Sequence, residues 1–298
     1  MNYCCFLAPT ISRHGFNRLI LGCLYSGGRG VYSSPLQFIQ RREQWIKAVS
    51  HFKGTHLQAP NFAFKLLLKK VNPETMKTLD LSSVRHIINA AEPIDYESCR
   101  DFLQKFSKSC GLRVDVLFPT YGLAESTVFV CSNGTGIALN VKRDALEKDG
   151  KAEILGEENI RNGGEKGGTE IDGSRYLVGC GIPEGDMDVK VVDPETQMVV
   201  EDTKVGEIWV RSPSKACGYY GMEEENQKSF RARIHDGTEE SKNALQPVEG
   251  ESPALGYLRT GDLGFIYNSE LFVCGRLKDL IIVRGRNYYP QDVESLAE

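Results

Sequence analysis

The 298-residue sequence has no run of about 18 apolar residues, so we expect no membrane-spanning helix. Its nine cysteines include no paired Cys-X-X-Cys spacing, which favours reduced thiols and a cytoplasmic location. Positive charge is not in excess either, because 36 Lys and Arg residues stand against 40 Asp and Glu residues, for a net charge of −4. This balance argues against a protein held to nucleic acid by bulk charge.

The composition is that of a globular protein. Hydrophobic residues make up 41% of the sequence and charged residues 26%, which argues against disorder and against collagen-like repeats. At about 150 residues per domain, the length suggests two globular units. A chain of this length can bury a sizeable core without disulfide bonds.

The first half of the sequence alternates between helical and extended patterns. Apolar residues at helical spacing predict helices over 37–52, 61–70 and 95–109. Residues 82–93 form a short apolar run that ends in small residues, as is typical of a buried parallel strand, and 113–122 read as a strand leading into a turn. Alternating strands and helices indicate an α/β domain with a mostly parallel sheet.

The pattern changes after residue 131. Residues 133–174 are rich in Gly, Glu and Lys, and the cluster NGGEKGG (162–168) within them is typical of a loop. Beyond them, short alternating strands separated by turns predict a small β-rich subdomain, with a helix over 222–233. The predicted strands are 175–181, 187–193, 206–212, 270–275 and 279–285.

Three separated strings carry the functional information: YGLAEST (121–127), YLRTGDLGF (257–265) and GRLKDLIIVRGRNYYPQD (275–292). Each string alone has an ordinary explanation. A single carboxylate such as Glu125 is most often solvated, and Asp262 after a glycine is first of all a turn residue. Lys278 and Asp279 are first of all a surface ion pair of little energetic value.

Together and in this order, the strings resemble the adenylate-forming (AMP-dependent synthetase/ligase) superfamily and, within it, the fatty-acyl-AMP ligases. The resemblance runs from about residue 19 to the end of the sequence. The string GRNYYPQDVE (285–294) is more similar to fatty-acyl-AMP ligases than to general acyl-CoA synthetases. Further matching strings are SPLQFI (34–39), APNFAF (59–64), DLSSVRHIINAAEP (80–93), VVDPET (191–196) and GEIWVR (206–211).

The resemblance implies an incomplete N-terminal unit of the adenylate-forming fold. A mostly parallel α/β subdomain would occupy residues 1–180, and a small β-rich subdomain would occupy 181–276. Residues 277–298 would form the hinge and the start of a truncated C-terminal domain. The segments 132–177 and 231–256 are longer than in typical acyl-CoA synthetases, and either could hold the insertion by which fatty-acyl-AMP ligases disfavour transfer to CoA.

The reaction implied by the resemblance is attack of a fatty-acid carboxylate on the α-phosphate of ATP, which expels pyrophosphate and leaves an acyl-adenylate. Such a reaction needs positioned reactants, a cation and groups that neutralise developing charge. Tyr121 would stack on the adenine, with Gly122 beside it in the nucleotide site. Glu125 would supply an oxygen ligand for the Mg²⁺ that accompanies ATP, and Ser126 would lie near the phosphate.

The same resemblance assigns the remaining site residues. Asp262 would bind the two ribose hydroxyls, since a carboxylate has two acceptor oxygens. Arg276 would add donors to the ribose or the phosphate. Lys278 occupies the pivot position, where the C-terminal domain rotates between adenylating and transferring poses. The wall around the base edge would be formed by Ala91, Glu92 and Pro93.

The resemblance also implies missing parts. The family's Ser/Thr/Gly-rich loop that grips the phosphates has no counterpart, and only residues 279–298 follow the hinge, without the lysine that assists adenylation. Where relatives carry a His-Asp pair before a glycine-rich helix, this sequence has SRHGF (12–16). We therefore expect a fragment of a longer protein that is inactive by itself.

We interpret the sequence as part of an ATP- and Mg²⁺-dependent ligase that activates a medium- or long-chain fatty acid. Handover to an acyl-carrier protein, for example of a polyketide synthase, is the expected next step. Two alternatives stay open: a long-chain acyl-CoA synthetase, and a catalytically dead AMP-binding-like domain that acts as a binding or regulatory module.

Overall fold

The computed structural model describes residues 22–161, 171–235, 256–283 and 286–290, and within them the chain divides into two compact units. Unit 1 consists of Met1–Thr120, Asn133–Ala138 and Glu158–Thr169. Unit 2 consists of Tyr121–Ser132, Leu139–Glu157 and Glu170–Glu298. The sequence suggested a subdomain boundary at residue 180, whereas the division into units falls after Thr120. Part of the difference comes from β4 (Cys131–Ser132), which pairs with β8 (Ile182–Pro183) inside unit 2.

A three-stranded parallel sheet organises unit 1. Its order is β1 (His56–Ala59), β2 (His86–Asn89) and β3 (Leu117–Pro119). Alternate residues of β1 and β2 are buried, so one face of the sheet is fully covered. The parallel arrangement confirms the α/β prediction for this half of the chain.

Helices precede and connect the three strands of this sheet along the chain. The described ones are α1 (Gly22–Ser26), α2 (Pro35–Gln40), α3 (Arg42–Phe52), α4 (Asn61–Lys70), α5 (Pro73–Lys77) and α6 (Tyr96–Cys110), with a 3₁₀ turn η2 (Val114–Val116). The single helix predicted over 37–52 was wrong, because Arg41 leaves helical geometry with φ −135° and ψ 62° and separates α2 from α3.

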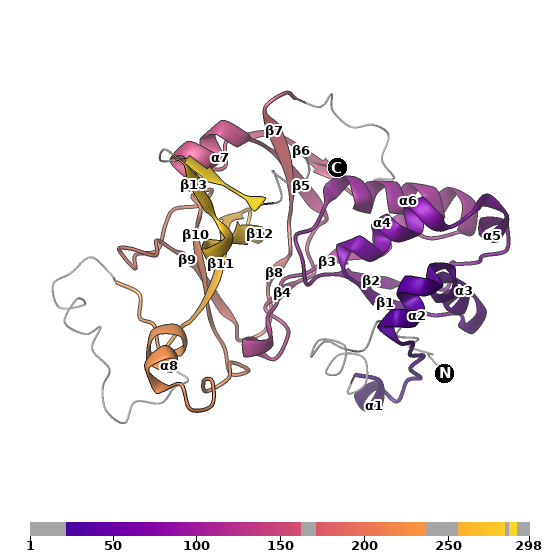
Figure 1. Ribbon diagram of the computed structural model, residues 1–298, viewed down its shortest axis with the longest axis horizontal. Coiled ribbons are helices and arrows are strands. Elements are labelled where there is room, and N and C mark those ends of the chain that lie inside the picture. Colours follow the sequence, from indigo (N-terminus) through magenta and orange to yellow (C-terminus); the bar gives the residue numbers. More distant parts are fainter. Residues whose placement is uncertain (1–21, 162–170, 236–255, 284–285, 291–298) are drawn as a thin grey trace. The chain divides into compact units, whose positions relative to one another are not determined.

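The core of unit 1 lies between α4 and α6, which run side by side (Figure 1). Phe64 of α4 and Phe102 of α6 are buried, and their ring centroids lie 4.9 Å apart in an edge-to-face arrangement. Phe106 extends the cluster, 4.7 Å from Phe102. Helix α6 begins at an Asp95 cap, whose side chain accepts the N–H of Ser98.

A four-stranded antiparallel sheet organises unit 2. Its order is β12 (Glu270–Arg276), β11 (Leu258–Tyr267), β10 (Gly206–Arg211) and β9 (Asp188–Val192). Five of the six residues of β10 are buried, as expected of a central strand. This sheet confirms the predicted β-rich part of the chain.

The remaining described strands form smaller sheets. One has the order β6 (Ile154–Asn159), β5 (Ile137–Lys142) and β7 (Ser174–Val178). A two-stranded ribbon joins β13 (Ile281–Val283) to β14 (Arg286–Tyr288), and the three side chains of β13 are 47%, 66% and 48% exposed. The remaining elements are α7 (Arg143–Asp149), α8 (Glu223–Phe230), and the 3₁₀ turns η3 (Ala124–Ser126) and η5 (Leu277–Asp279).

Several features expected from the sequence lie outside the described residues. These are the SRHGF segment, most of the long segment 231–256 and the ends of the string 285–294. Among the helices that the structure describes, none is both long enough and apolar enough to cross a membrane.

Candidate functional site

The centre of the candidate site is a hydrogen bond between Tyr121 and Asp262, which lie 141 residues apart in the sequence. The Tyr121 hydroxyl donates to Oδ2 of Asp262 over 2.7 Å. A two-way backbone bridge to Cys131 fixes Tyr121, at 3.1 Å for its N–H and 3.0 Å for its carbonyl. Both site residues are buried, with exposed fractions of 8% and 9%.

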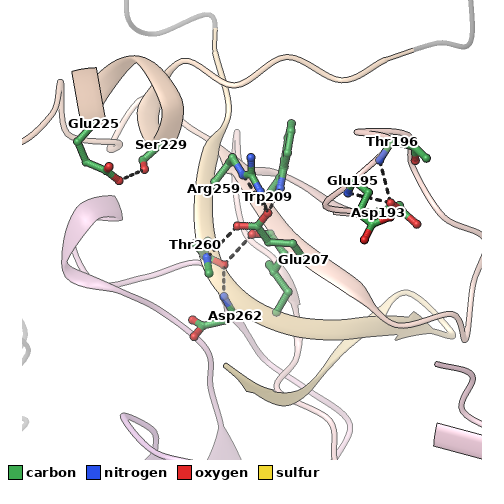
Figure 2. Close-up of polar contacts among 12 residues, drawn as sticks. Asp193, Glu195, Thr196, Glu207, Trp209, Glu225, Ser229, Arg259, Thr260 and Asp262 are labelled. Atoms are coloured by element: carbon green, nitrogen blue, oxygen red, sulfur yellow. Dashed lines mark hydrogen bonds and ion pairs between the residues drawn. The ribbon is translucent and has the colours of Figure 1, made fainter. Parts of the chain in front are cut away.

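Asp262 lies within β11, directly opposite Arg276 of β12. Nε of Arg276 lies 3.2 Å from Oδ1 of Asp262, so each carboxylate oxygen faces a donor. The N–H of Asp262 donates to Oγ1 of Thr260 over 3.1 Å (Figure 2). The Arg276 side chain remains 60% exposed. Solvent therefore reaches the guanidinium of this ion pair, while the Asp262 carboxylate is buried.

Burial dominates the titration of this pair. It raises the pKa of Asp262 above the ordinary value of 3.8, although the hydrogen bond from Tyr121 and the charge of Arg276 act in the opposite direction. Burial and the adjacent Asp262 charge also raise the pKa of Tyr121 well above its usual range. The phenol therefore stays protonated and remains a donor to the carboxylate.

Glu125 and Ser126 lie in the 3₁₀ turn η3, and their side chains have different surroundings. Oε1 of the half-buried Glu125 accepts the hydroxyl of Tyr219 over 2.8 Å, and its backbone carbonyl accepts the N–H of Ala216 over 2.7 Å. Ser126 is fully buried, with its hydroxyl 3.3 Å from that of Ser212. The structure therefore leaves Glu125 partly accessible and packs the Ser126 side chain inside the protein.

Gly122 is required by the backbone that follows it. A Cβ atom at this position would lie 1.6 Å from the carbonyl oxygen of Val128. Thr127 and Val128 both adopt left-handed backbone conformations, with φ 52° and φ 93°. For a β-branched residue such as Val128 this conformation is strained, and strain of this kind concentrates at functional sites.

Ala91, Glu92 and Pro93 belong to unit 1, where they follow the end of β2. All three are exposed. Ala91 has φ 80°, an unusual left-handed conformation for a residue with a Cβ, and the carboxylate of Glu92 accepts the N–H of Phe62. The backbone conformation of Ala91 and the contact of Glu92 with Phe62 thus both constrain this segment.

Lys278 lies in the 3₁₀ turn η5 and is exposed. The turn directly follows β12, the strand that carries Arg276. An exposed position at the end of a sheet strand is compatible with the predicted pivot.

The structure adds two site residues that the sequence alone did not point to. Tyr219 donates to Glu125, and Thr260 accepts the N–H of Asp262. Thr260 lies inside the string YLRTGDLGF and could have been found from its place two residues before Asp262. Tyr219 lies in an unremarkable GYYG stretch, with no pattern to connect it to Glu125.

The donor set suits Mg²⁺ bound together with a nucleotide. Among the described residues, no group of three or more His, Cys, Asp or Glu side chains could hold a metal ion alone. Mg²⁺ is usually bound by one or two carboxylates plus substrate phosphates, and Glu125 offers one such partly accessible carboxylate. The residues present therefore fit a metal that arrives with its phosphate ligands.

Comparison with known proteins gives consistent matches over most of the chain. A family model described as AMP-binding enzyme matches residues 2–220. The medium-chain-fatty-acid–[acyl-carrier-protein] ligase JamA of Moorena producens is 39% identical over 290 residues, which are 97% of this chain and 45% of that protein. The 4-hydroxyphenylalkanoate adenylyltransferase of Mycobacterium tuberculosis is 34% identical over 265 residues, which are 89% of this chain and 39% of that protein.

A solved structure extends the comparison to three dimensions. The crystal structure of fatty acyl-adenylate ligase from L. pneumophila, in complex with acyl adenylate and pyrophosphate, matches with a TM-score of 0.77 and 34% sequence identity. The match covers 99% of this chain and 47% of that one. The chain thus spans less than half the length of these relatives.

Proposed function

We propose, because the chain belongs to the AMP-binding enzyme family, that it forms part of an enzyme that activates a fatty acid with ATP to give the acyl-adenylate. The fold prediction is confirmed, since the solved relative is an adenylate-forming ligase whose structure covers the whole α/β and β-rich arrangement. The observation that carries the proposal is the buried Asp262 carboxylate, held between Tyr121 and Arg276.

The Asp262 carboxylate is suited to ribose recognition. A carboxylate has about four acceptor sites, so it can accept ribose hydroxyls while keeping its present donors. Hydrogen bonds to a buried, charged acceptor are stronger than hydrogen bonds between neutral groups. In this proposal Tyr121 presents its ring to the adenine and orients Asp262 through its hydroxyl, and Arg276 donates to the ribose or the phosphate.

The other predicted residues take supporting roles. Ala91, Glu92 and Pro93 would contact the base edge, where the left-handed Ala91 sets the path of the backbone. Gly122 keeps the Tyr121 loop closely folded on Val128. The buried Ser126 would stabilise the turn η3, which lies near the phosphates in this proposal. Lys278 would be the pivot residue.

Magnesium would supply charge neutralisation at the phosphates when bound with ATP. Glu125 would hold it, and the Tyr219 hydroxyl orients that carboxylate. The chain's own contribution to the reaction is otherwise positional, because holding the carboxylate and the α-phosphate in reacting geometry supplies much of the rate.

The proposed substrate is a medium- or long-chain fatty acid, and the proposed acceptor is an acyl-carrier protein. The name of the Moorena producens relative supports both. Transfer to CoA is the competing outcome. Labelled dodecanoic acid, offered with ATP, holo-acyl-carrier protein and CoA to a protein of the relatives' full length that contains this chain, separates the two acceptors by the labelled product.

Binding of a stable acyl-adenylate mimic tests the proposal on the chain itself. Dodecanoyl-sulfamoyladenosine should bind more tightly than sulfamoyladenosine in calorimetry, because the acyl chain adds apolar burial. Asp262→Ala should weaken both by about tenfold or more, since each hydrogen bond to a charged group contributes about 1.5–3 kcal/mol. The surface variant Lys190→Gln serves as the control. Equal binding by Asp262→Ala and the unmodified chain would refute the ribose role, and a preference for a 4-hydroxyphenylalkanoyl mimic would refute the fatty-acid class.

A further inference from the structure

We propose that Glu207 is a positioning residue for the ribose-binding carboxylate, because it holds the backbone of Gly261 directly before Asp262. This inference rests on the function proposed above. No motif singled out Glu207 as a site residue, although it lies in the matching string GEIWVR (206–211).

Glu207 lies on the inner strand β10 and is only 2% exposed, and its side chain accepts hydrogen bonds from β11 and from Trp209 of β10. Its Oε1 accepts the N–H of Gly261 over 3.1 Å. Its Oε2 accepts Nε1 of Trp209 over 2.9 Å and two guanidinium nitrogens of Arg259, at 2.9 and 2.8 Å. Figure 2 shows this side chain between Arg259, Trp209 and the Thr260–Asp262 stretch.

The contact matters because the β10–β11 ladder is irregular at this point. Glu207 lies opposite Leu263 and Trp209 lies opposite Arg259, so three residues of β11, numbers 260–262, face the single residue Ile208. Such an insertion leaves backbone groups without ladder partners and re-aims the side chains near it. Asp262 is one of the three residues that face Ile208, two more than a regular ladder would place there.

Side chains replace the missing ladder bonds in the insertion. Thr260 donates its hydroxyl to the carbonyl of Ile208 over 2.7 Å and accepts the N–H of Asp262. Gly261, at φ 71°, has a left-handed conformation, and its N–H goes to Glu207. Glu207 and Thr260 together therefore fix the backbone from which the Asp262 side chain projects.

A carboxylate is the group that this place requires. Four N–H groups converge on the two oxygens of Glu207, and glutamate offers only acceptors. A glutamine of the same shape has only one acceptor oxygen. Its amide nitrogen, a donor, would therefore face another donor, either the N–H of Gly261 or the guanidinium of Arg259. The positive charge of Arg259, whose guanidinium also lies 5.3 Å from the Trp209 ring, compensates the buried negative charge.

The test compares ribose recognition in Glu207→Gln with that in the unmodified 298-residue chain. AMP and 2′,3′-dideoxyadenosine monophosphate are titrated by calorimetry, and the ratio of their dissociation constants measures what the ribose hydroxyls contribute. The unmodified chain should prefer AMP by about tenfold or more. In Glu207→Gln this ratio should fall toward one, because Asp262 is no longer aimed.

The matched control is Arg211→Gln, which removes another ion pair of β10, that with Asp188 at 2.7 Å, and has no contact with Gly261. It should keep the full ratio. Glu207→Gln with the ratio of the unmodified chain would overturn the proposal. If Glu207→Gln does not fold, Glu207→Asp takes its place, since the shorter carboxylate can keep Arg259 and release Gly261.

Amide hydrogen exchange at Gly261 separates this proposal from the function on which it rests. In the unmodified chain the Gly261 amide should exchange as slowly as amides of the regular β11 ladder, and in the Glu207 variant at least about tenfold faster. Fast exchange in the unmodified chain would overturn the positioning role whatever binds. A protected Gly261 together with no preference for AMP would instead refute the ribose assignment of Asp262.

Discussion

The two units hold their candidate site residues in opposite ways. In unit 1, Ala91–Pro93 lie on an exposed stretch after a parallel strand, and the buried aromatic cluster lies elsewhere, on α4 and α6. In unit 2, Tyr121 and Asp262 are themselves buried and bound to each other. Unit 1 thus separates stability from the site, whereas unit 2 places polar site residues within its own packed interior.

This difference shows which site residues lower the stability of the fold. A buried carboxylate with a raised pKa lowers the stability of the fold that contains it, whereas an exposed loop imposes almost no such cost. Substitutions in the aromatic cluster of unit 1 should therefore change stability and leave the site chemistry intact. Substitutions at the unit 2 site should change both together.

The largest expected effect is in the aromatic cluster of unit 1. Phe102→Ala should lower the free energy of unfolding by about 3–5 kcal/mol, because it leaves a cavity beside Phe64 and Phe106. Urea denaturation followed by circular dichroism measures the loss. Phe52→Ala, at a side chain that is 49% exposed, is the control and should stay within about 1 kcal/mol. Equal losses would show that the cluster is not the core of the unit.

The next largest effect should come from the Tyr121 loop of unit 2. Gly122→Ala should cost about 3 kcal/mol in unfolding free energy, because the added Cβ meets the Val128 carbonyl and the backbone must move. Gly156→Ala provides the control, since a Cβ at Gly156 meets nothing within 4 Å. The same denaturation assay should find that control unchanged. A stable Gly122→Ala protein would mean that the loop is free to shift.

Tyr121→Phe should cost about 1.5–3 kcal/mol, the usual contribution of a hydrogen bond to a charged group. It should also raise the pKa of Asp262 further, because the Tyr121 hydroxyl now lowers it. Tyr267→Phe removes an exposed hydroxyl contact to Glu157 and should cost less. If the two variants lost the same stability, burial of the Tyr121–Asp262 pair would not be what gives the bond its strength.

The smallest expected effects concern the pH dependence of the unfolding free energy. The contributions of Asp262 in unit 2 and Glu43 in unit 1 should change in opposite directions as pH rises. The pKa of Asp262 is raised in the folded state, so its stabilising effect is present below 3.8 and is lost as pH rises through the folded value. The unfolding free energy of the unmodified chain minus that of Asp262→Asn should therefore fall with rising pH.

Glu43 of unit 1 should behave in the opposite way. Hydrogen bonding by Lys47 lowers the pKa of Glu43 in the folded state, so its contribution is present above 4.5 and is lost as pH falls. The advantage of the unmodified chain over Glu43→Gln should be below about 1 kcal/mol at neutral pH and vanish in acid. Denaturation of the unmodified chain, Asp262→Asn and Glu43→Gln from acid to neutral pH measures both differences in unfolding free energy. If both differences changed with pH in the same direction, the comparison would be contradicted.

Local sequence signals were sufficient for some elements. Helix α6 combines a regular apolar period with an Asp95 cap and a left-handed Gly111 at its end, so it was predicted almost to the residue. The break at Arg41 carries no proline or glycine, and helical spacing continues across it. Strand β11 contains two glycines and an inserted stretch, so its pairing with β10 and β12 depends on tertiary contacts that no period reveals.

The candidate site was predictable only through the resemblance. Tyr121 and Asp262 are far apart in the sequence, and no spacing rule connects them. The inward packing of Ser126 against Ser212 and the Tyr219 contact of Glu125 depend on how one loop folds onto another. The role of Glu207 depends on a ladder irregularity, which is a property of two paired strands and not of either alone.

The β13–β14 ribbon has a consequence for handling the protein. Three successive apolar side chains of β13 are about half exposed or more, and among the described residues the ribbon has only two strands. Unpaired backbone groups beside apolar side chains provide a template for pairing with a second molecule. The rate at which two molecules pair rises with the square of the protein concentration, so precipitation should increase steeply with concentration. Dilute samples at low temperature should stay clear, because apolar attraction weakens on cooling.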